Sequence, residues 1–194
     1  MKKITVIVFL IIFCASALSA DELLNTGMKL GLNYSKFIGK DIQGKGVNSI
    51  PGFSLGGFIN YKLNDRFSLQ PEILITTKGS LINTVGDINL HNVFIYYEMP
   101  ILVKFTFLGK RKFKPVLFCG PAVDVTCLAI NDTNFPNDIR KIDLGFILDA
   151  GIEFSKISLD IRYNQGLLNF DKSADDISLK NSTISLIVGF SFRR

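Results

Sequence analysis

The chain has no tryptophan, one histidine and three cysteines among its 194 residues. After residue 20 it contains no apolar run of about 18 residues or more, so the sequence predicts no transmembrane helix there. Basic residues are scattered and never gather in a run, which argues against nucleic-acid binding. One histidine and no close cysteine pair supply too few ligands for a zinc site. These absences argue against a helical membrane protein, a nucleic-acid-binding protein and a zinc protein.

Two of the cysteines lie in one predicted strand and are too far apart to pair. Cys119 and Cys127 are separated by a length of extended chain that corresponds to about 26 Å. A disulfide requires Cα atoms no more than about 7 Å apart. We therefore expect both to be unpaired, small apolar side chains, while Cys14 lies in the N-terminal segment.

The first twenty residues have the organisation of a secretory signal peptide. Lys2 and Lys3 form a basic start, residues 4–13 are apolar, and the small residues of CASALSA follow. Such a segment is too short for a membrane anchor and is removed after export. We predict cleavage after Ala20, which leaves residues 21–194 as one domain. Its formal charge is +3, the +5 of the whole chain less the two signal lysines.

Two details at this end leave alternatives open. Cleavage after Ala17 or Ser19 also fits the small residues before these bonds. Cys14 raises the alternative of a lipoprotein, but Phe13 precedes it, where lipidation signals carry a small residue. An exported protein without a spanning helix is periplasmic, released to the exterior, or inserted in a membrane as a β-barrel.

Eight stretches after the signal peptide show the period-two alternation of half-buried β-strands. They are residues 27–37, 52–63, 67–78, 93–107, 113–127, 141–154, 157–166 and 182–193. Short links (64–66, 108–112 and 155–156) alternate with long polar links (38–51, 79–92, 128–140 and 167–181). Strict alternation of this kind is typical of up-and-down barrels. We predict an all-β fold, an eight-stranded antiparallel up-and-down transmembrane β-barrel.

In nearly every stretch one face is apolar and the other carries the charges. In residues 142–154, for example, Leu144, Phe146 and Leu148 share one face, whereas Asp149 and Glu153 share the other. A basic residue on the lipid face costs about 2–4 kcal/mol at the bilayer midplane, which explains such clean apolar faces. We therefore expect the apolar faces to point outward to lipid. A soluble, lipocalin-like barrel with the apolar face inside is the alternative.

The segment YYEMPILVKF, residues 96–105, places a proline and two charges inside an otherwise apolar run. Glu98, Pro100 and Lys104 share the face that we expect to line the lumen. Because proline cannot donate to the strand ladder, and a closed barrel has no edge strand, Pro100 predicts a bulge or a missing ladder bond. The same is expected at Pro71, Pro115 and Pro121.

Several segments, in order along the chain, carry a family resemblance. They are SLQPEI with TTKG (68–73 and 76–79), YYEMPILVKF (96–105), the pair Gly120–Pro121, DLGFILDAGIEF (143–154), IRYNQGLLN (161–169) and LIVGFSF (186–192). Together they resemble the PorT-like family of outer-membrane β-barrels, common in Bacteroidota. Two features depart from the family pattern: Asp149 stands where a glycine is expected, and two arginines follow the terminal aromatic Phe192.

The resemblance implies a barrel of the OmpA or OmpX size class in the cell outer membrane. It would be surrounded by outer-membrane lipid and inserted by the barrel-assembly machinery. Some members of the family resemble components of the type IX secretion and gliding apparatus. Envelope or secretion proteins are therefore implied as partners.

The charged residues of the inward faces form the candidate site. They are Lys62, Glu72, Glu98, Lys104, Asp124, Asp149, Glu153, Asp160 and Arg162. The interior of an eight-stranded barrel is just wide enough for side chains to fill. Because an isolated buried ion costs several kcal/mol, these charges are expected to pair. We expect an ionic plug that holds the barrel closed, with a conducting or substrate-binding lumen as the alternative.

Catalysis has one candidate base, His91, near the outer end of the fourth predicted strand. Ser80 and Asp87 lie in the same region, but the sequence has no G-x-S-x-G nucleophile motif. The acids of NDTNFPND, residues 131–138, lack the spacing of a calcium loop. We therefore expect no enzyme activity, no metal and no cofactor.

The sequence as a whole predicts a non-enzymatic integral outer-membrane β-barrel. Its role would be structural or as a partner of other envelope components, with a link to protein secretion. The four long links are the expected interaction surface, because barrels place recognition in such loops. Two alternatives remain: a soluble exported β-barrel that binds a small apolar ligand, and an outer-membrane enzyme that uses His91.

Overall fold

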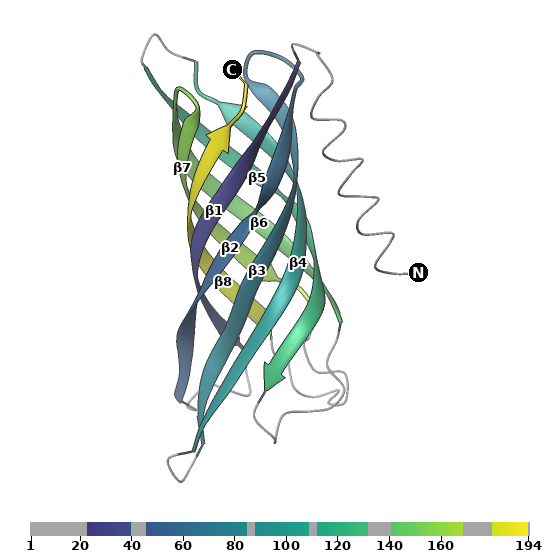
Figure 1. Cartoon of the computed structure of the whole chain (residues 1–194), viewed down its shortest axis with the longest axis vertical. Coiled ribbons are helices and arrows are strands. Elements are labelled where there is room, and N and C mark those ends of the chain that lie inside the picture. Colours follow the sequence, from purple (N-terminus) through teal and green to yellow (C-terminus); the bar gives the residue numbers. More distant parts are fainter. Residues whose placement is uncertain are drawn as a thin grey trace.

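The computed structural model describes residues 23–39, 46–84, 88–108, 112–131, 141–168 and 180–193. They form a closed barrel of eight antiparallel strands (Figure 1), which confirms the predicted fold. The strands are β1 (Leu24–Ile38), β2 (Gly46–Lys62), β3 (Phe67–Thr84), β4 (Ile88–Thr106), β5 (Phe113–Asn131), β6 (Ile142–Phe154), β7 (Ile157–Gly166) and β8 (Lys180–Ser191). β1 pairs with β8 and closes the barrel. The predicted signal peptide, residues 1–20, lies outside the described residues.

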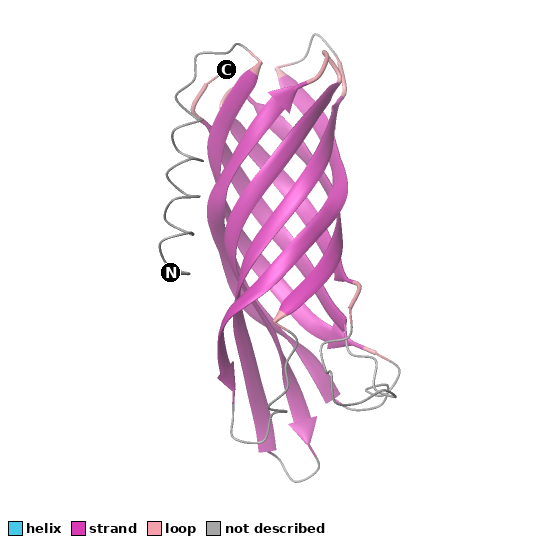
Figure 2. Ribbon diagram, turned by 90° about the vertical axis from the view of Figure 1, so that its right-hand side faces the viewer, coloured by secondary structure: helices cyan, strands magenta, loops and turns pink. Residues whose placement is uncertain are grey.

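The two ends of the barrel differ: at one end tight turns join the strands, and at the other end some strands extend beyond the barrel body. The turns at 63–66 and 155–156 lie at one end, together with the described C-terminus (Figure 1). At the other end β3 and β4 run on beyond the barrel body (Figure 2). Residues 46–51, 79–84, 88–92 and 128–131, predicted as parts of long links, belong to strands instead. The prediction was wrong there because each of these segments contains asparagine, and the first two also glycine, which are residues typical of turns and loops.

The apolar faces of the strands point outward. In β1, Lys29 and Asn33 are buried, whereas Leu30 and Leu32, which lie between them in the sequence, are 59% and 70% exposed. The same alternation holds in β6 and β7. Lipid solvates such side chains, and water would not, so the outward orientation is confirmed and the soluble barrel with an apolar interior is wrong. No helix in the described part of the chain is long and apolar enough to cross a membrane.

Cys119 and Cys127 are both unpaired, as predicted, and both are exposed. Cys119 lies on the outer face of β5, opposite Leu148 of β6 and Val103 of β4. Cys127 lies near the far end of the same strand, beside a register shift in the pairing of β4 with β5. Both thiols therefore belong to the outer surface of the barrel.

The prolines interrupt strand pairing without shifting its register. Pro100 pairs with Ala122 of β5, but the ladder to β3 has no pair between Pro71–Ile101 and Leu74–Glu98. The register is the same on both sides of this gap, so Pro100 causes no bulge. Proline has no N–H, and the gap reflects the missing donor. Pro115 and Pro121 also keep their register against β6.

A register shift does occur near Pro51, which the sequence did not single out. The pairing of β2 with β3 shifts between Ser49 and Ser54. Within this segment the Phe53 N–H donates to Thr77 Oγ1 at 2.7 Å. A side chain thus replaces the backbone partner that the irregular segment lacks.

The interior is less polar than predicted. One wall carries a buried apolar cluster of Leu102, Val116, Phe118, Ala122 and Ile147. Towards the long-strand end, Phe94 contacts Phe37 and Tyr96, with ring centroids 6.4 and 6.2 Å apart. These side chains fill the space between the charged groups and leave the barrel with a packed core.

Candidate functional site

Eight of the nine predicted lumen charges lie inside the barrel or at its mouth. Seven are buried: Glu72, Glu98, Lys104, Asp124, Asp149, Asp160 and Arg162. Glu153 is partly exposed and forms an ion pair with buried Lys104. The ninth, Lys62, does not belong to the lumen.

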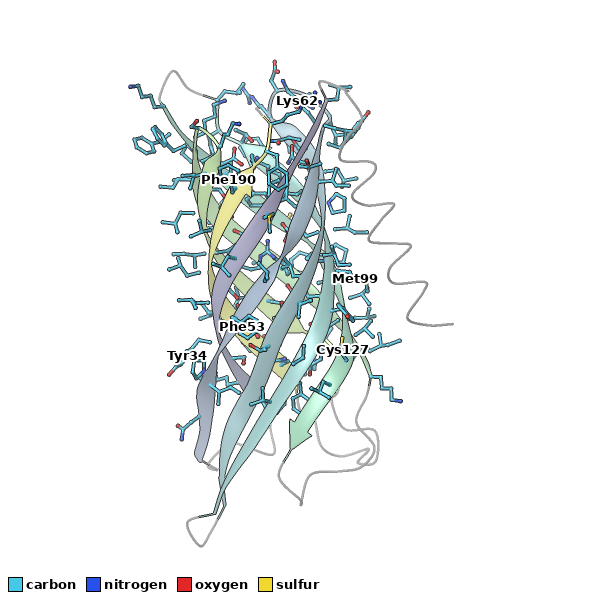
Figure 3. All side chains as sticks on the ribbon, viewed as in Figure 1. Tyr34, Phe53, Lys62, Met99, Cys127 and Phe190 are labelled. Carbon is cyan, nitrogen blue, oxygen red and sulfur yellow. The ribbon has the colours of Figure 1, made fainter. Side chains whose placement is uncertain are left out.

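Lys62 is the last residue of β2 and lies at the rim, as Figure 3 shows. Its ammonium pairs with Asp65 of the following turn at 2.8 Å, and both side chains are exposed. The Lys62 ammonium lowers the pKa of the Asp65 carboxyl, first by its hydrogen bond and then by its charge. The alternation rule failed here because a side chain at a strand end can turn out to water.

Two buried lysines belong to the lumen and were missing from the predicted set. Lys29 of β1 and Lys78 of β3 are 3% and 2% exposed. The signal for Lys29 was available, because it stands between two outward residues, Met28 and Leu30. Lys78 follows Thr76 on the polar face of its strand.

Arg162 is the centre of the largest charged cluster. Its Nε lies 2.9 Å from Asp149 Oδ2, the residue directly opposite on β6. Its Nη1 and Nη2 donate to the two carboxylate oxygens of Glu72 on β3, at 2.8 and 3.1 Å. The guanidinium fork matches a carboxylate in this geometry, which makes the contact both strong and directional.

Lys29 completes this cluster from β1. Its Nζ lies 2.8 Å from Glu72 Oε1 and 3.6 Å from Asp160 Oδ2. The ammonium also lies over the ring of Phe118, 5.0 Å from its centroid. Glu72 therefore forms ion pairs with both Arg162 and Lys29. It also accepts a hydrogen bond of 2.8 Å from Gln70 Nε2.

A second cluster forms around Lys78. Its Nζ lies 2.5 Å from Glu98 and 2.6 Å from Asp124. The two acids face each other across β4 and β5, where like charges destabilise a strand pair. Lys78 offsets this repulsion. Asn164 donates to Glu98 at 3.1 Å, which ties the cluster to β7.

The lumen charges do not balance. In the ion pairs of the described lumen residues, four cations (Lys29, Lys78, Lys104 and Arg162) meet six carboxylates (Glu72, Glu98, Asp124, Asp149, Glu153 and Asp160). Asp143 of β6 is a further acid on the inward face, opposite Asp124. One buried oxygen each of Asp124, Asp149 and Asp160 has no hydrogen-bond partner among the described residues. The described residues also contain no group of three side chains arranged to hold a metal ion. The arrangement is suited to holding the barrel walls together.

The predicted catalytic candidates fall at the long-strand end. His91 lies in β4 opposite Leu81, and Ser80 of β3 pairs with Asn92. Asp87 and the side chains of Ser80 and His91 lie outside the described residues, as does most of the acidic segment 131–138. The absence of enzyme activity therefore stays a prediction.

Two solved barrels share this architecture. OprG, an outer membrane protein from Pseudomonas aeruginosa, superposes with a TM-score of 0.55 at 11% identity, covering 88% of this chain and 96% of OprG. Neisserial surface protein A superposes with a TM-score of 0.53 at 15% identity, covering 86% of this chain and 97% of its own. At such low identity the similarity concerns the fold alone. No sequence among curated proteins matches the chain.

The sequence profile of a family described as outer membrane protein beta-barrel domain matches residues 17–172. The match spans most of the chain, and the closed barrel with its apolar outer face agrees with it. These observations place the protein in the outer membrane. The chain belongs to the outer membrane protein beta-barrel domain family.

Proposed function

We propose that this protein is a non-enzymatic, closed barrel that serves as a structural component and protein partner in the outer membrane. The observation that supports this most is the bidentate pairing of Arg162 with Glu72 across the lumen. A transport pathway would need mobile or hydrated groups at that level. Here both side chains are almost completely buried, and further ion pairs surround them.

A closed lumen leaves the outer surface and the two ends for function. At the long-strand end, β3 and β4 extend beyond the barrel body and present their backbone there (Figure 2). Barrels of this kind place their longer loops outside the cell. We propose this end as the surface that contacts other envelope proteins.

We further propose membership of the PorT-like group and a link to protein secretion. The ordered segments from SLQPEI to LIVGFSF support this proposal. In this role outer-membrane lipid surrounds the barrel, and the assembly machinery reads the aromatic end of β8 during insertion. Phe190 and Phe192 lie at that end, exposed and 6.0 Å apart between ring centroids.

A deletion strain tests the role, and planar bilayers test the closed lumen. We expect the deletion to reduce the amount of secreted protein, and re-expression of the full chain to restore it. A deletion strain with normal secretion contradicts the secretion link.

The purified barrel should give no stable single-channel current in planar bilayers, and a reproducible open conductance would contradict the closed lumen.

A further inference from the structure

A small cavity opens at the short-turn end of the barrel. It has a volume of about 170 Å³. Its inner wall includes Asn25 and Lys104, and its rim includes Lys112, Lys114, Lys156 and Arg193. Barrels of this kind place their short turns in the periplasm. The cavity is therefore the periplasmic mouth of the lumen.

The charge around this mouth is strongly one-sided. Five cationic side chains line it, namely Lys104, Lys112, Lys114, Lys156 and Arg193, whereas Glu153 is the one carboxylate among its lining residues. Glu153 is already paired with Lys104. Within the described part of the chain, the other four cations have no carboxylate within 4.0 Å. Lys156 Nζ donates instead to the backbone oxygen of Phe192 at 3.1 Å. Among the described residues, no carboxylate offsets the mutual repulsion of these four cations.

Neutral hydrogen-bonding groups lie in the same cavity. Asn60, Ser155, Ser158 and Ser191 contribute amide and hydroxyl groups to its lining. Asn25 Oδ1 is buried there and has no hydrogen-bond partner among the residues that the structure describes. A bound group that offers both acceptor oxygens and a hydroxyl would satisfy the cations and this amide oxygen together. Hydrogen phosphate has that combination, whereas chloride does not.

The mouth also lies at the level of the membrane surface. The stacked rings of Phe113 and Phe154, 4.9 Å apart, lie beside the rim, and Phe190 and Phe192 lie near it on β8 and its end. Aromatic side chains of this kind gather at the membrane–water interface. A phosphate could therefore reach the cavity either from the periplasm or from a lipid headgroup of the adjacent leaflet.

We propose that the periplasmic mouth is a binding site for a phosphate group, held by Lys112, Lys114, Lys156 and Arg193. The arginine offers a planar fork of donors to two phosphate oxygens, and the lysines contribute point charges that adjust to its position. This site adjoins the Lys104–Glu153 pair and is separate from the clusters around Arg162 and Lys78. It does not depend on the secretion role proposed above.

The first experiment measures inorganic phosphate binding by the folded protein in a maltoside detergent, which contains no phosphate. Phosphate is titrated by calorimetry, with sodium chloride holding the ionic strength constant. We expect saturable binding that the double substitution Lys156→Gln, Arg193→Gln weakens at least about tenfold, because two charge-assisted contacts are lost. The pair Lys112→Gln, Lys114→Gln provides an independent variant with the same expectation.

A matched control uses lysines at the opposite end of the barrel. Lys36 of β1 and Lys141 before β6 are exposed and do not line the mouth. The double substitution Lys36→Gln, Lys141→Gln removes the same net charge and should leave phosphate affinity unchanged. An equal loss in control and mouth variants overturns the proposal, because it reports general attraction to the basic protein. The compact band of unboiled protein in SDS gels checks that each variant is folded.

A second arm identifies the source of the phosphate. Phosphatidylglycerol retention in maltoside micelles is measured by mass spectrometry for the same proteins. Retention lost in the mouth variants supports a lipid source, and binding of inorganic phosphate alone supports a soluble source. Binding of neither probe overturns the proposal. Binding of an acidic peptide without either phosphate probe also overturns it, since the mouth would then be a protein-docking surface.

Discussion

Arg162 of β7 and Glu72 of β3 meet in the middle of the lumen through two hydrogen bonds of 2.8 and 3.1 Å. The two strands are not neighbours in the barrel, because β4, β5 and β6 lie between them on one side. The pair therefore joins opposite walls. Adjacent-strand hydrogen bonds close the barrel, and this contact fixes its cross-section.

Removing Arg162 should strongly destabilise the barrel. Arg162→Met keeps much of the side-chain volume but leaves Asp149 without its cation and Glu72 with Lys29 alone. Breaking a buried ion pair in this way costs about 3–5 kcal/mol. Urea-induced unfolding of the barrel in lipid vesicles measures the change in the free energy of unfolding.

The control for this substitution is Lys62→Met, which removes the exposed pair with Asp65. Exposed pairs contribute little, because water and salt screen them. We expect the unfolding curve of Lys62→Met to overlay that of the unmodified protein. An Arg162→Met protein as stable as this control would show that the lumen network is not a structural element.

A basic residue on the outer face should be costly only within the membrane. Leu148 lies at the centre of β6 and is 54% exposed to the lipid side, whereas Leu63 is exposed in a turn at the rim. Leu148→Arg is expected to lower the free energy of unfolding by about 2–4 kcal/mol, the cost near the bilayer midplane. Leu63→Arg should have little effect. Equal costs at the two positions, measured in vesicles, would contradict the assignment of the lipid-facing surface.

The strand number and the direction of each face could be predicted because both depend on local alternation. A charge such as Lys29, flanked by two lipid-facing residues, must point inward wherever it lies in the barrel. Strand ends do not obey this rule, as Lys62 shows. There the backbone reaches water, and either face is then acceptable for a charge.

The contacts across the lumen could not be predicted in this way. Which inward residue of β3 lies level with Arg162 depends on the stagger of all the strands between them. Irregularities near Pro51 and Cys127 change this stagger, and neither carries a clear sequence signal. The sequence therefore predicts that Glu72 must find a cation, and only the closed barrel shows that Arg162 and Lys29 supply it.

Gly56 is expected to tolerate no side chain, because β3 approaches it closely. A Cβ at this position would overlap the carbonyl oxygen of Ile73 and lie 2.7 Å from Leu74 Cα. Both are backbone atoms that cannot move without breaking the β2–β3 ladder. Gly56→Ala should therefore destabilise the barrel by about 1–3 kcal/mol, the usual cost of overpacking.

Gly189→Ala is the matched control for this prediction. Its Cβ would meet the hydroxyl oxygen of Ser158 at 2.5 Å, and a rotation of that side chain relieves the contact. We expect a clearly smaller change than for Gly56→Ala. Urea unfolding compares the two, and a larger loss for Gly189→Ala would show that backbone approach does not govern these glycines.

The two free cysteines should differ in their reaction with a water-soluble maleimide. Cys119 faces lipid at the middle of β5 between Val103 and Leu148, whereas Cys127 lies near the long-strand end. In vesicles the single-cysteine protein that retains Cys119 should react much more slowly than the one that retains Cys127. Unfolding in urea should remove the difference, because both thiols then reach water. Rapid labelling of Cys119 in the folded barrel would contradict its position in the lipid-facing belt.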